Sequence, residues 1–495
     1  KAVLCTPTAA PPKWLVDEYP SVLQEEKDGT TREFGSRRHY CYNSEVYRRE
    51  SKRIVEKLAE RFADVDAVVG WQIDNEYGWA GTRHCYCDDC ASGFREWLRE
   101  KYGDVETLNE RWGTAFWSQE LNTFAQIEPP GHTPGSHHPS KLLDYHRFTN
   151  DGVTEYNRLQ AEVLRTYNDE WFVTHNFMSH DALDANRVAE DLDFASWDSY
   201  PTGHVQERES VSPAEYRAGD PDNIGLDHDL YRSVTESAPW IMEQQPGDIN
   251  WPTYSPQPAA GAMRLWAHYA TGHGAEVVSY FRWRQAKTGQ EQYHSGLCSY
   301  DGTLDRGYHE ATDVATELEA LRDAVGGDDL ALPDAPVAIV HDYESLWALE
   351  DEPNTPEFDY WGHLETYYTA LRERGVTVDF VSPDDALEDY EAVIAPTLYL
   401  VDEERTATLE SFVENGGELL VTMRTGFKDL DNKLQDSAQP GPLADLVGAT
   451  VAQFESIPAS LERDVIYDGE RFECRVWNEW LSPTESSDAV GQYAG

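Results

Sequence analysis

Two stretches of the sequence place a glutamate where an apolar segment gives way to polar residues. The first is WQIDNEYG at residues 71–78, after the apolar run at residues 67–70, and the second is PWIME at residues 239–243. A buried strand that ends on carboxylates is costly unless those groups face a cavity. A loop whose acids simply face water is the alternative for the first stretch, and the recurrence of the pattern favours the cavity.

Glu76 and Glu243, which belong to these stretches, are the residue type that hydrolyses glycosidic bonds. In a retaining mechanism the two carboxyls lie about 5 Å apart; one protonates the leaving oxygen and the other attacks the anomeric carbon. One carboxyl must keep a proton while the other stays ionised, so the two need different surroundings. Asn75 stands beside Glu76 and would supply the amide that holds a sugar 2-hydroxyl.

Other side chains could complete a sugar site. Tryptophan rings offer flat apolar faces for sugar rings, although a tryptophan at an arbitrary position is more often part of a core. Charged and imidazole side chains offer hydrogen bonds to hydroxyl groups. The candidates for stacking are Trp117, Trp251 and Trp283, and the candidates for hydrogen bonding are Arg38, Glu291 and His294.

A separate cluster of thiols points to a metal. Cys85, Cys87 and Cys90 fall within six residues, and Cys41 ends an earlier loop. Four thiolates that leave no open coordination position are typical of a structural zinc site, and free buried thiols are the alternative. The remaining thiols are expected to be small buried residues, namely Cys5, Cys298 and Cys474. An odd total of seven cysteines argues against a disulfide framework, so we expect a reducing compartment and a cytoplasmic protein.

The elements that must position these residues alternate between strand and helix. Six strands are predicted, beginning near residues 1, 67, 171, 194, 239 and 277, each followed by polar or aromatic residues. Between them we expect helices, including one capped by Ser44 and a long one at about 140–168. This is the signature of a TIM-type (β/α) barrel. A closed barrel needs eight strands, so we expect two to be missing before Lys1.

A second domain follows the composition shift at residues 326–329. Strands expected at 337–341, 376–381, 392–395 and 419–422, with helices between them, resemble a doubly wound α/β sheet. It carries no glycine-rich dinucleotide fingerprint and no P-loop, and no organic cofactor is expected. The predicted organisation is an incomplete catalytic barrel at residues 1–325 and an α/β domain at 334–450. Residues 451–495 would be the end of that domain or the start of a truncated C-terminal β domain.

The charge of the chain is extreme. Its 495 residues include 91 acids and 40 bases, which gives a net charge of −51. Such a surface repels nucleic acid and anionic membranes, and no apolar run approaches the roughly 18 residues of a membrane span. Because salt screens self-repulsion over a few ångströms, we expect a protein from a halophilic source.

Several motifs, in the right order, resemble those of glycoside hydrolase family 42 β-galactosidases of the haloarchaeal type. Residues 71–78 and 242–247, the latter with Asn250 and Trp251, resemble the two catalytic motifs of that family. Further matches are TPTA at 6–9, PPKW at 11–14, RRHYC at 37–41 and EQYHSG at 291–296. The resemblance is dense over about residues 1–325, and the second domain matches by pattern.

This resemblance implies a retaining exo-β-galactosidase with Glu76 as acid/base and Glu243 as nucleophile. It also implies galactose contacts and a pocket lining from Arg38, Asn75, Trp251, Glu291, His294, Trp117 and Phe281. Similar cysteines bind zinc in many members, which implies zinc on Cys41, Cys85, Cys87 and Cys90. The second domain would be the family's trimerisation domain, similar to glutamine amidotransferases, in a homotrimer. No cysteine lies between Cys298 and Cys474, so an amidotransferase nucleophile is absent.

The chain also departs from the family pattern. The first two strands, which contribute another sugar-binding arginine, and most of the small C-terminal domain are missing, and Cys298 stands where an aliphatic residue is expected. The alternatives are another glycoside specificity on the same barrel, such as α-L-arabinosidase or β-fucosidase, or an inactive sugar-binding fragment. The matched pair Glu76 and Glu243 argues against a binding protein, which needs no such pair.

Overall fold

The computed structural model describes residues 1–178, 180, 183–207, 210–235, 237–325, 332–461 and 463–494. The chain divides into two compact units. The first contains strands β1 to β7 and the second contains strands β8 to β16. The composition shift at residues 326–329 lies outside the described residues.

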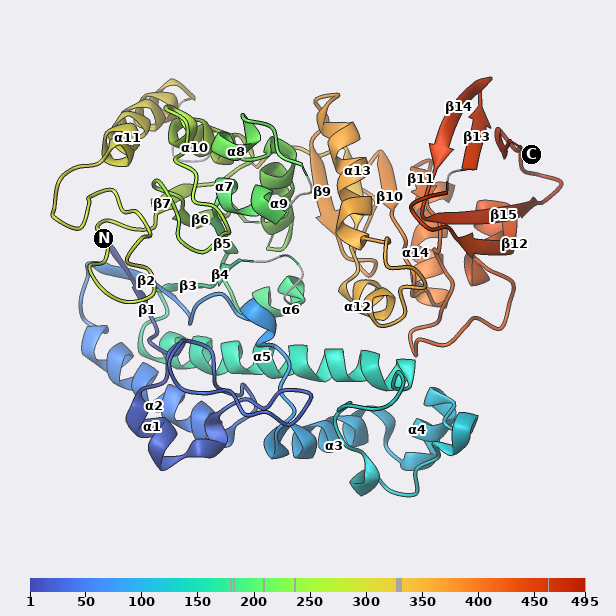
Figure 1. The fold of residues 1–495 in the computed structure, drawn as a ribbon, viewed down its shortest axis with the longest axis horizontal. Coiled ribbons are helices and arrows are strands. Elements are labelled where there is room, and N and C mark those ends of the chain that lie inside the picture. Colours follow the sequence, from blue (N-terminus) through green and yellow to red (C-terminus); the bar gives the residue numbers. More distant parts are fainter. Residues whose placement is uncertain are drawn as a thin grey trace. The chain divides into compact units, whose positions relative to one another are not determined.

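A series of parallel strands forms the centre of the first unit (Figure 1). One sheet has the order β1-β2-β3 and the next has the order β4-β5-β6-β7, and only His175 separates β3 from β4 along the chain. The six strand segments predicted from the sequence are therefore confirmed. Among the described strands, β1 and β7 stand at the two ends of the series, so the expected two further strands are not tested. The strands are β1 (Ala2–Cys5), β2 (Val68–Gln72), β3 (Phe172–Thr174), β4 (Asn176–Phe177), β5 (Ser196–Ser199), β6 (Trp240–Gln244) and β7 (Val277–Tyr280).

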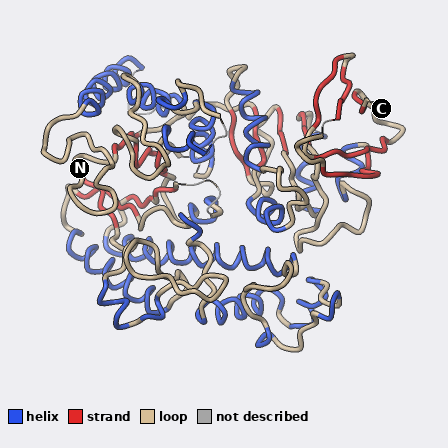
Figure 2. Tube along the Cα trace, in the orientation of Figure 1, coloured by secondary structure: helices blue, strands red, loops and turns tan. Residues whose placement is uncertain are grey.

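Helices occupy the connections between these strands, as Figure 2 shows in blue against red. Ser44 begins α2 as predicted, because its hydroxyl accepts the amide proton of Tyr47 at 3.4 Å. The long helix predicted near residues 140–168 is α5 (Pro139–Tyr167). The other connecting helices are α1 (Lys13–Glu18), α2 (Glu45–Phe62), α6 (Ala185–Ala189), α7 (Pro201–His204), α8 (Glu215–Ala218), α9 (Pro221–Ser233), α10 (Ala262–Gly272) and α11 (Arg306–Val325).

The second unit contains a four-stranded parallel sheet of order β11-β10-β8-β9. The chain moves outward from β8 first to one side and then to the other, which is the doubly wound arrangement predicted from the sequence. A cluster of buried aliphatic residues packs around this sheet, with Val340, Val393 and Leu409 among them. The elements are β8 (Val337–Val340), α12 (Tyr343–Asp351), α13 (Tyr360–Arg372), β9 (Val378–Val381), β10 (Ala392–Ala395), α14 (Glu403–Glu414) and β11 (Glu418–Val421).

The rest of the second unit consists of short helices and antiparallel strands. Strand β12 (Ala449–Ser456) pairs with β15 (Trp477–Pro483). A second sheet has the order β14-β13-β16, with β13 at Arg463–Tyr467, β14 at Glu470–Cys474 and β16 at Gly491–Tyr493. The helices are α3 (Asp88–Tyr102), α4 (Val105–Trp112) and α15 (Ala444–Val447). Across the described residues, every helix is too short or too polar to cross a bilayer.

Candidate active site

Three carboxyl groups meet where the parallel strands of the first unit end. Glu76 follows β2, Asp198 lies in β5 and Glu243 lies in β6. One carboxylate oxygen from each lies within 4.8 Å of the others. Parallel strands bring their carboxyl ends to one edge, and the register makes Asp198 and Glu243 direct neighbours on β5 and β6. The structure thus brings the predicted pair together and adds Asp198, which the sequence analysis did not identify.

These carboxyls cannot all carry a charge at neutral pH, because like charges so close disfavour ionisation. Burial and the Glu76 carboxylate raise the pKa of Glu243 to about 8, although the Tyr200 hydroxyl and Arg37 oppose the shift. Burial and the neighbouring Glu243 raise the pKa of Asp198 well above its ordinary range. Arg37 Nη2 lies 2.7 Å from Glu76 Oε2, so Glu76 has a cation beside it. The group therefore retains protons at neutral pH.

The side chain of Asn176 connects this group to the predicted sugar contact. Its Nδ2 donates to Asn75 Oδ1 at 3.0 Å and to Asp198 Oδ2 at 2.7 Å, while its Oδ1 accepts from Gln72 Nε2 at 2.7 Å. Asn75 Oδ1 is thus occupied as an acceptor. Its Nδ2 is buried and has no hydrogen-bond partner. A buried donor without a partner is costly, so this amide is well suited to donate to a ligand hydroxyl.

Asp74 stabilises the segment that carries Asn75 and Glu76 through hydrogen bonds. Its Oδ2 accepts hydrogen bonds from Thr8 Oγ1 at 2.7 Å and from the Tyr40 hydroxyl at 2.9 Å. Its Oδ1 accepts the amide proton of Asn75 at 2.8 Å. Asp74 and Glu76 both adopt left-handed backbone conformations, with φ of 50° and 45°. Non-glycine residues keep such conformations only where the surroundings enforce them, and these often lie at functional sites.

His175 fixes the same segment from the neighbouring strand. Its Nδ1 donates to the Ile73 carbonyl at 2.8 Å, and its Nε2 accepts the amide proton of Tyr77 at 3.1 Å. Burial lowers the pKa of His175 to about 3, so the ring is neutral and can accept at Nε2. This imidazole therefore holds both sides of the turn that carries Glu76.

The two adjacent arginines of the RRHYC motif have different surroundings. Arg38 is only 1% exposed and its Nη1 lies 3.9 Å from Asp74 Oδ1. Arg37, with a side chain 34% exposed, is the one that reaches Glu76. The three guanidinium nitrogens of Arg38 are buried without a hydrogen-bond partner, so a sugar contact by Arg38 stays a prediction. Spacing alone could not separate the two neighbours.

Aromatic side chains surround the carboxyl group of Glu243. The Tyr200 hydroxyl donates to Glu243 Oε2. The Tyr200 ring lies 6.0 Å from Trp251 and 5.5 Å from His294, measured between ring centroids. The Phe281 ring lies 5.1 Å from His294. The structure therefore brings together Trp251, Phe281 and His294, which were predicted from separate motifs, and adds Tyr200.

Polar groups continue this wall. Glu291 accepts a hydrogen bond from Arg282 Nη1 at 3.0 Å and its side chain is 39% exposed. Burial and Arg282 lower the pKa of His294 to about 4, so its ring is neutral, and its buried Nε2 has no hydrogen-bond partner. Trp117 belongs to the second compact unit, where it is 81% exposed, and Trp283 is 63% exposed. A sugar contact by Trp117 stays a prediction.

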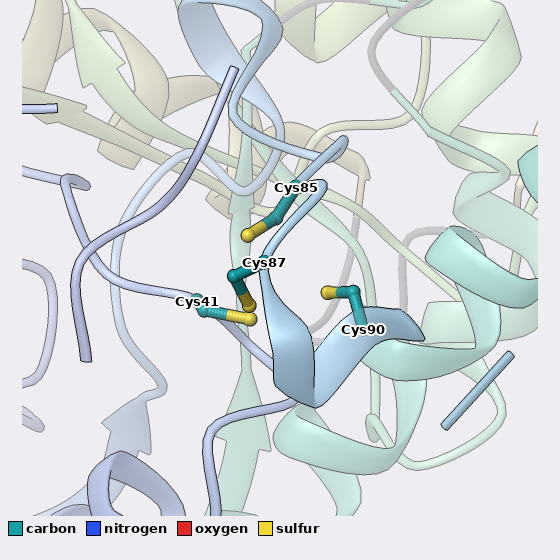
Figure 3. Close-up of side chains that lie close together, drawn as sticks. All are labelled: Cys41, Cys85, Cys87 and Cys90. Atoms are coloured by element: carbon teal, nitrogen blue, oxygen red, sulfur yellow. The ribbon is translucent and has the colours of Figure 1, made fainter. Parts of the chain in front are cut away.

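The four cysteines predicted to bind zinc form a second candidate site. The sulfurs of Cys41, Cys85, Cys87 and Cys90 are buried and lie within 4.8 Å of one another (Figure 3). None of the described cysteines forms a disulfide. Of the other thiols, Cys298 is buried and Cys474 is half-buried. The prediction that Cys5 is buried is wrong, because it lies exposed on β1, at one end of the strand series.

The thiol group fits a tetrahedral zinc ion. Zinc–sulfur bonds of about 2.3 Å give sulfur–sulfur edges of about 3.8 Å, inside the observed limit. Cys87 precedes the first residue of α3 and Cys90 lies in its first turn, where the helix dipole favours thiolates. The amide of Glu25 also donates to Cys85 Sγ at 3.5 Å. Such hydrogen bonds stabilise metal-bound thiolates.

Opposed carboxyls at the carboxyl ends of parallel strands, beside an aromatic wall, are characteristic of barrel glycoside hydrolases. A family model described as β-galactosidase, glycoside hydrolase family 42, matches residues 1–321. A model of the β-galactosidase trimerisation domain matches residues 335–495. The chain belongs to glycoside hydrolase family 42.

Relatives support this assignment over the length of the chain. The β-galactosidase BgaH of Haloferax lucentense is 57% identical, in an alignment that covers 98% of this chain and 72% of the relative. A β-galactosidase of Thermus thermophilus is 47% identical, with 97% and 74% covered. The structure of the polyextremophilic β-galactosidase from Halorubrum lacusprofundi is 55% identical with a TM-score of 0.96, and covers 100% of this chain and 73% of that one. The predicted class, a TIM barrel with a following domain, is thereby confirmed.

Proposed function

We propose that the protein is a retaining exo-β-galactosidase in which Glu76 is the acid/base and Glu243 the nucleophile. The observation that carries the assignment is the approach of these two carboxylates to within 4.8 Å. A retaining mechanism needs carboxyls about 5 Å apart, whereas an inverting one needs room for a water between them. Membership of a β-galactosidase family supports galactose as the sugar.

The reaction proceeds in two displacements. Glu243 attacks the anomeric carbon while the glycosidic C–O bond breaks and Glu76 gives its proton to the leaving oxygen. Glu76 then takes a proton from water as that water attacks the same carbon, which releases galactose and the Glu243 carboxylate. Because each step inverts the anomeric carbon, the product keeps the β configuration.

Glu76 and Glu243 must share one proton for this sequence to start. In the free site Arg37 pairs with Glu76, and the pKa of Glu243 is about 8, so this proton rests on Glu243. The first displacement needs the opposite arrangement. We expect bound galactose to draw Arg37 from Glu76 towards sugar hydroxyls, after which the proton passes to Glu76. Arg37 thus joins Arg38 as a proposed arginine contact.

The remaining contacts follow from the groups that surround the carboxylates. The unpaired Nδ2 of Asn75 donates to the sugar 2-hydroxyl. Trp251 and Phe281 form the apolar wall, and Glu291 with neutral His294 binds hydroxyls on the far side of the ring. The family resemblance adds Trp117 to the lining of the pocket.

The four cysteines are proposed to hold one structural zinc ion. Their complete set of thiolates leaves no coordination position for a substrate, so the ion would link the chain segments and take no part in hydrolysis. No organic cofactor is needed for a reaction carried by two carboxyls.

The oligomeric state, the domain organisation and the cellular location are proposed from less specific observations. The trimerisation domain supports a homotrimer, and the doubly wound sheet supports a likeness to glutamine amidotransferases. We retain the predicted domains at residues 1–325, 334–450 and 451–495. The lack of disulfides among the described cysteines supports a cytoplasmic location.

The net charge of −51 and the haloarchaeal relatives support adaptation to high salt. Self-repulsion of this surface is screened only at high ionic strength, so the melting temperature should rise from low to multimolar KCl. A melting temperature that does not fall when KCl is removed would contradict this adaptation.

Replacement of the nucleophile tests the proposed function. Glu243→Ala should lower the turnover of an aryl β-galactoside by about 10⁴-fold or more. Azide should restore turnover and give the galactosyl azide of inverted configuration, because it enters the space left by the carboxylate. Glu276→Ala, just before β7 at the opposite end of the strands, should retain full activity.

Two results would contradict the assignment. Undiminished activity in Glu243→Ala would exclude Glu243 as nucleophile, and absence of turnover by the parent in any salt would refute the hydrolase. Aryl α-L-arabinoside and β-D-fucoside should be poorer substrates by kcat/KM; a preference for either would favour that alternative specificity.

A further inference from the structure

Asp198 is a third carboxyl group in the site that the two-carboxylate reaction does not use. It lies in β5 beside Glu243 of β6, and its carboxylate reaches within 4.8 Å of both catalytic carboxylates. It is 0% exposed. A fully buried acid beside two others opposes ionisation of the whole group, so its presence calls for a physical reason.

The three carboxyls differ in the partners that could stabilise a negative charge. Glu76 has the guanidinium of Arg37 at 2.7 Å, and Glu243 accepts the hydroxyl proton of Tyr200. Asp198 has only the neutral amide of Asn176 on its Oδ2, and its buried Oδ1 has no hydrogen-bond partner. Asp198 therefore has the hydrogen-bond surroundings that favour a negative charge least. The direction of its pKa shift, upward through burial and Glu243, agrees with this geometry.

The amide of Asn176 connects this neutral acid to Asn75, the proposed contact to the sugar. Its Nδ2 donates both to Asp198 Oδ2 and to Asn75 Oδ1, and its Oδ1 accepts from Gln72. These bonds determine which side of the Asn75 amide is engaged and leave the Asn75 Nδ2 for the sugar. Removal of the Asp198 carbonyl oxygen would take away the shortest bond made by the Asn176 Nδ2, and the donor of Asn75 would be held less firmly.

We propose that Asp198 is a positioning residue which, as a neutral carboxylic acid, holds Asn176 and thereby directs the Asn75 amide to the sugar 2-hydroxyl. This inference rests on the proposed function. Neutrality matters because an ionised Asp198 would favour protons on both Glu76 and Glu243 and leave no nucleophile. With Asp198 neutral, the catalytic pair shares the single proton that a double displacement requires.

Two substitutions test whether Asp198 acts as a neutral acid or as an ionised carboxylate. Asp198→Asn keeps a carbonyl oxygen for Asn176 and cannot be charged, whereas Asp198→Ala removes the acceptor. The substrates are an aryl β-galactoside and its 2-deoxy counterpart, compared by kcat/KM. Asp198→Asn should stay within about tenfold of the parent and keep its preference for the 2-hydroxyl. Asp198→Ala should lose about 100-fold on the full substrate and about tenfold of that preference.

The preference ratio is the decisive measurement, because general damage to the fold lowers both substrates equally. Ser199→Ala, the next residue along β5, is the matched control and should leave the ratio unchanged. An Asp198→Asn variant as inactive as Glu243→Ala would overturn the proposal, since an ionised carboxylate would then be required. An unchanged preference in Asp198→Ala would overturn it as well.

Calorimetry with galactose and 2-deoxygalactose gives the same comparison without turnover. A parent that binds galactose but hydrolyses nothing would refute the proposed function alone, and the ratio of the two affinities in the Asp198 variants would still test the positioning role. A parent that binds neither sugar would overturn both.

Discussion

The three carboxyls of the candidate active site and the four cysteines are similar in geometry and opposite in energetics. Each group gathers ionisable side chains whose ligand atoms lie within 4.8 Å. The thiols form a complete donor set for a tetrahedral cation, so their proximity is stabilising once metal binds. The carboxyls instead disfavour one another's ionisation. Burial and mutual repulsion raise the pKa of Asp198 and Glu243, and left-handed conformations persist at Asp74 and Glu76.

This difference indicates that the carboxyl group lowers the stability of the fold, whereas the cysteine group contributes to that stability once metal is bound. The strained carboxyl site is ready for a substrate whose hydroxyls satisfy its buried donors. With zinc bound as proposed, the cysteine group would be closed to substrates and would hold the segment that follows the Glu76 turn. Substitutions should therefore have opposite consequences: those at Glu76 and Glu243 should abolish activity and spare or increase stability, and those at the cysteines should lower stability and spare activity.

The largest effect on stability is expected from Cys87→Ser. Loss of one of four thiolates weakens zinc, and structural zinc binding contributes directly to folding free energy, so we expect destabilisation by about 3 kcal/mol or more. At temperatures where the variant remains folded, kcat should stay within about twofold of the parent. Thermal melts, elemental analysis and steady-state kinetics measure these quantities, and a strong chelator should lower the melting temperature of the parent.

Cys474→Ser is the matched control, because this half-buried thiol lies outside the group and donates to Asn478 Oδ1 at 3.1 Å, a bond that serine can keep. It should melt near the parent temperature. If the purified parent contains no zinc and Cys87→Ser melts at the same temperature as the parent, the cysteines make no metal-dependent contribution to stability and leave the comparison.

A smaller and opposite effect is expected from Glu243→Gln. The pKa of Glu243 rises from 4.5 to about 8 on folding, so the folded state binds this proton more tightly than the unfolded state does. Stability from this group is present below about pH 4.5 and is lost as pH rises to about 8. Glutamine cannot ionise and escapes this loss. The variant should gain about 1–3 kcal/mol relative to the parent between pH 5 and pH 9.

Denaturant unfolding at the two pH values, in constant high salt, measures this gain. Glu276→Gln, at the opposite end of the strands, should show no pH-dependent difference from the parent. If Glu243→Gln and the parent differ by the same amount at pH 5 and pH 9, burial of the carboxyl carries no cost and the two regions do not differ as described.

The sequence predicted that Glu76 meets Glu243 and that the cysteines cluster, because local patterns encode both. A strand followed by a polar motif places Glu76 and Glu243 at one edge of a parallel series, and close spacing gathers three of the four thiols. Both predictions depend on chain direction and proximity, which the order of residues contains. The strand and helix alternation of both units was predictable for the same reason.

The residues that the sequence analysis missed are those whose roles depend on register and side-chain direction. Asp198 and Asn176 reach Glu76 across a hundred residues or more of chain, through pairing that no local pattern fixes. Arg37 and Arg38 are adjacent and chemically identical, and a φ of 61° at Arg38 contributes to directing one guanidinium inward and the other to Glu76. The sequence offered one signal that could have been used: Asp198 also lies near the end of a predicted strand, in the motif WDSYP.

The smallest effect should come from Gly203→Ala, which moves the aromatic wall and leaves the carboxyls in place. A Cβ at Gly203 would lie 2.3 Å from Trp251 Cη2 and 2.8 Å from Ile249 Cδ1, so the indole must shift. We expect KM for an aryl β-galactoside to rise about threefold to tenfold with kcat nearly unchanged, because the wall binds substrate and transition state alike.

Gly272→Ala is the matched control for this change, since a Cβ there meets no atom within 4 Å at the end of α10. It should leave both kinetic constants unchanged. A fall in kcat for Gly203→Ala with KM unaffected would mean that Trp251 acts on the reacting centre itself. Trp251 would then have to be grouped with the carboxyls that carry out the reaction, because its displacement would change kcat and not only the affinity for the substrate.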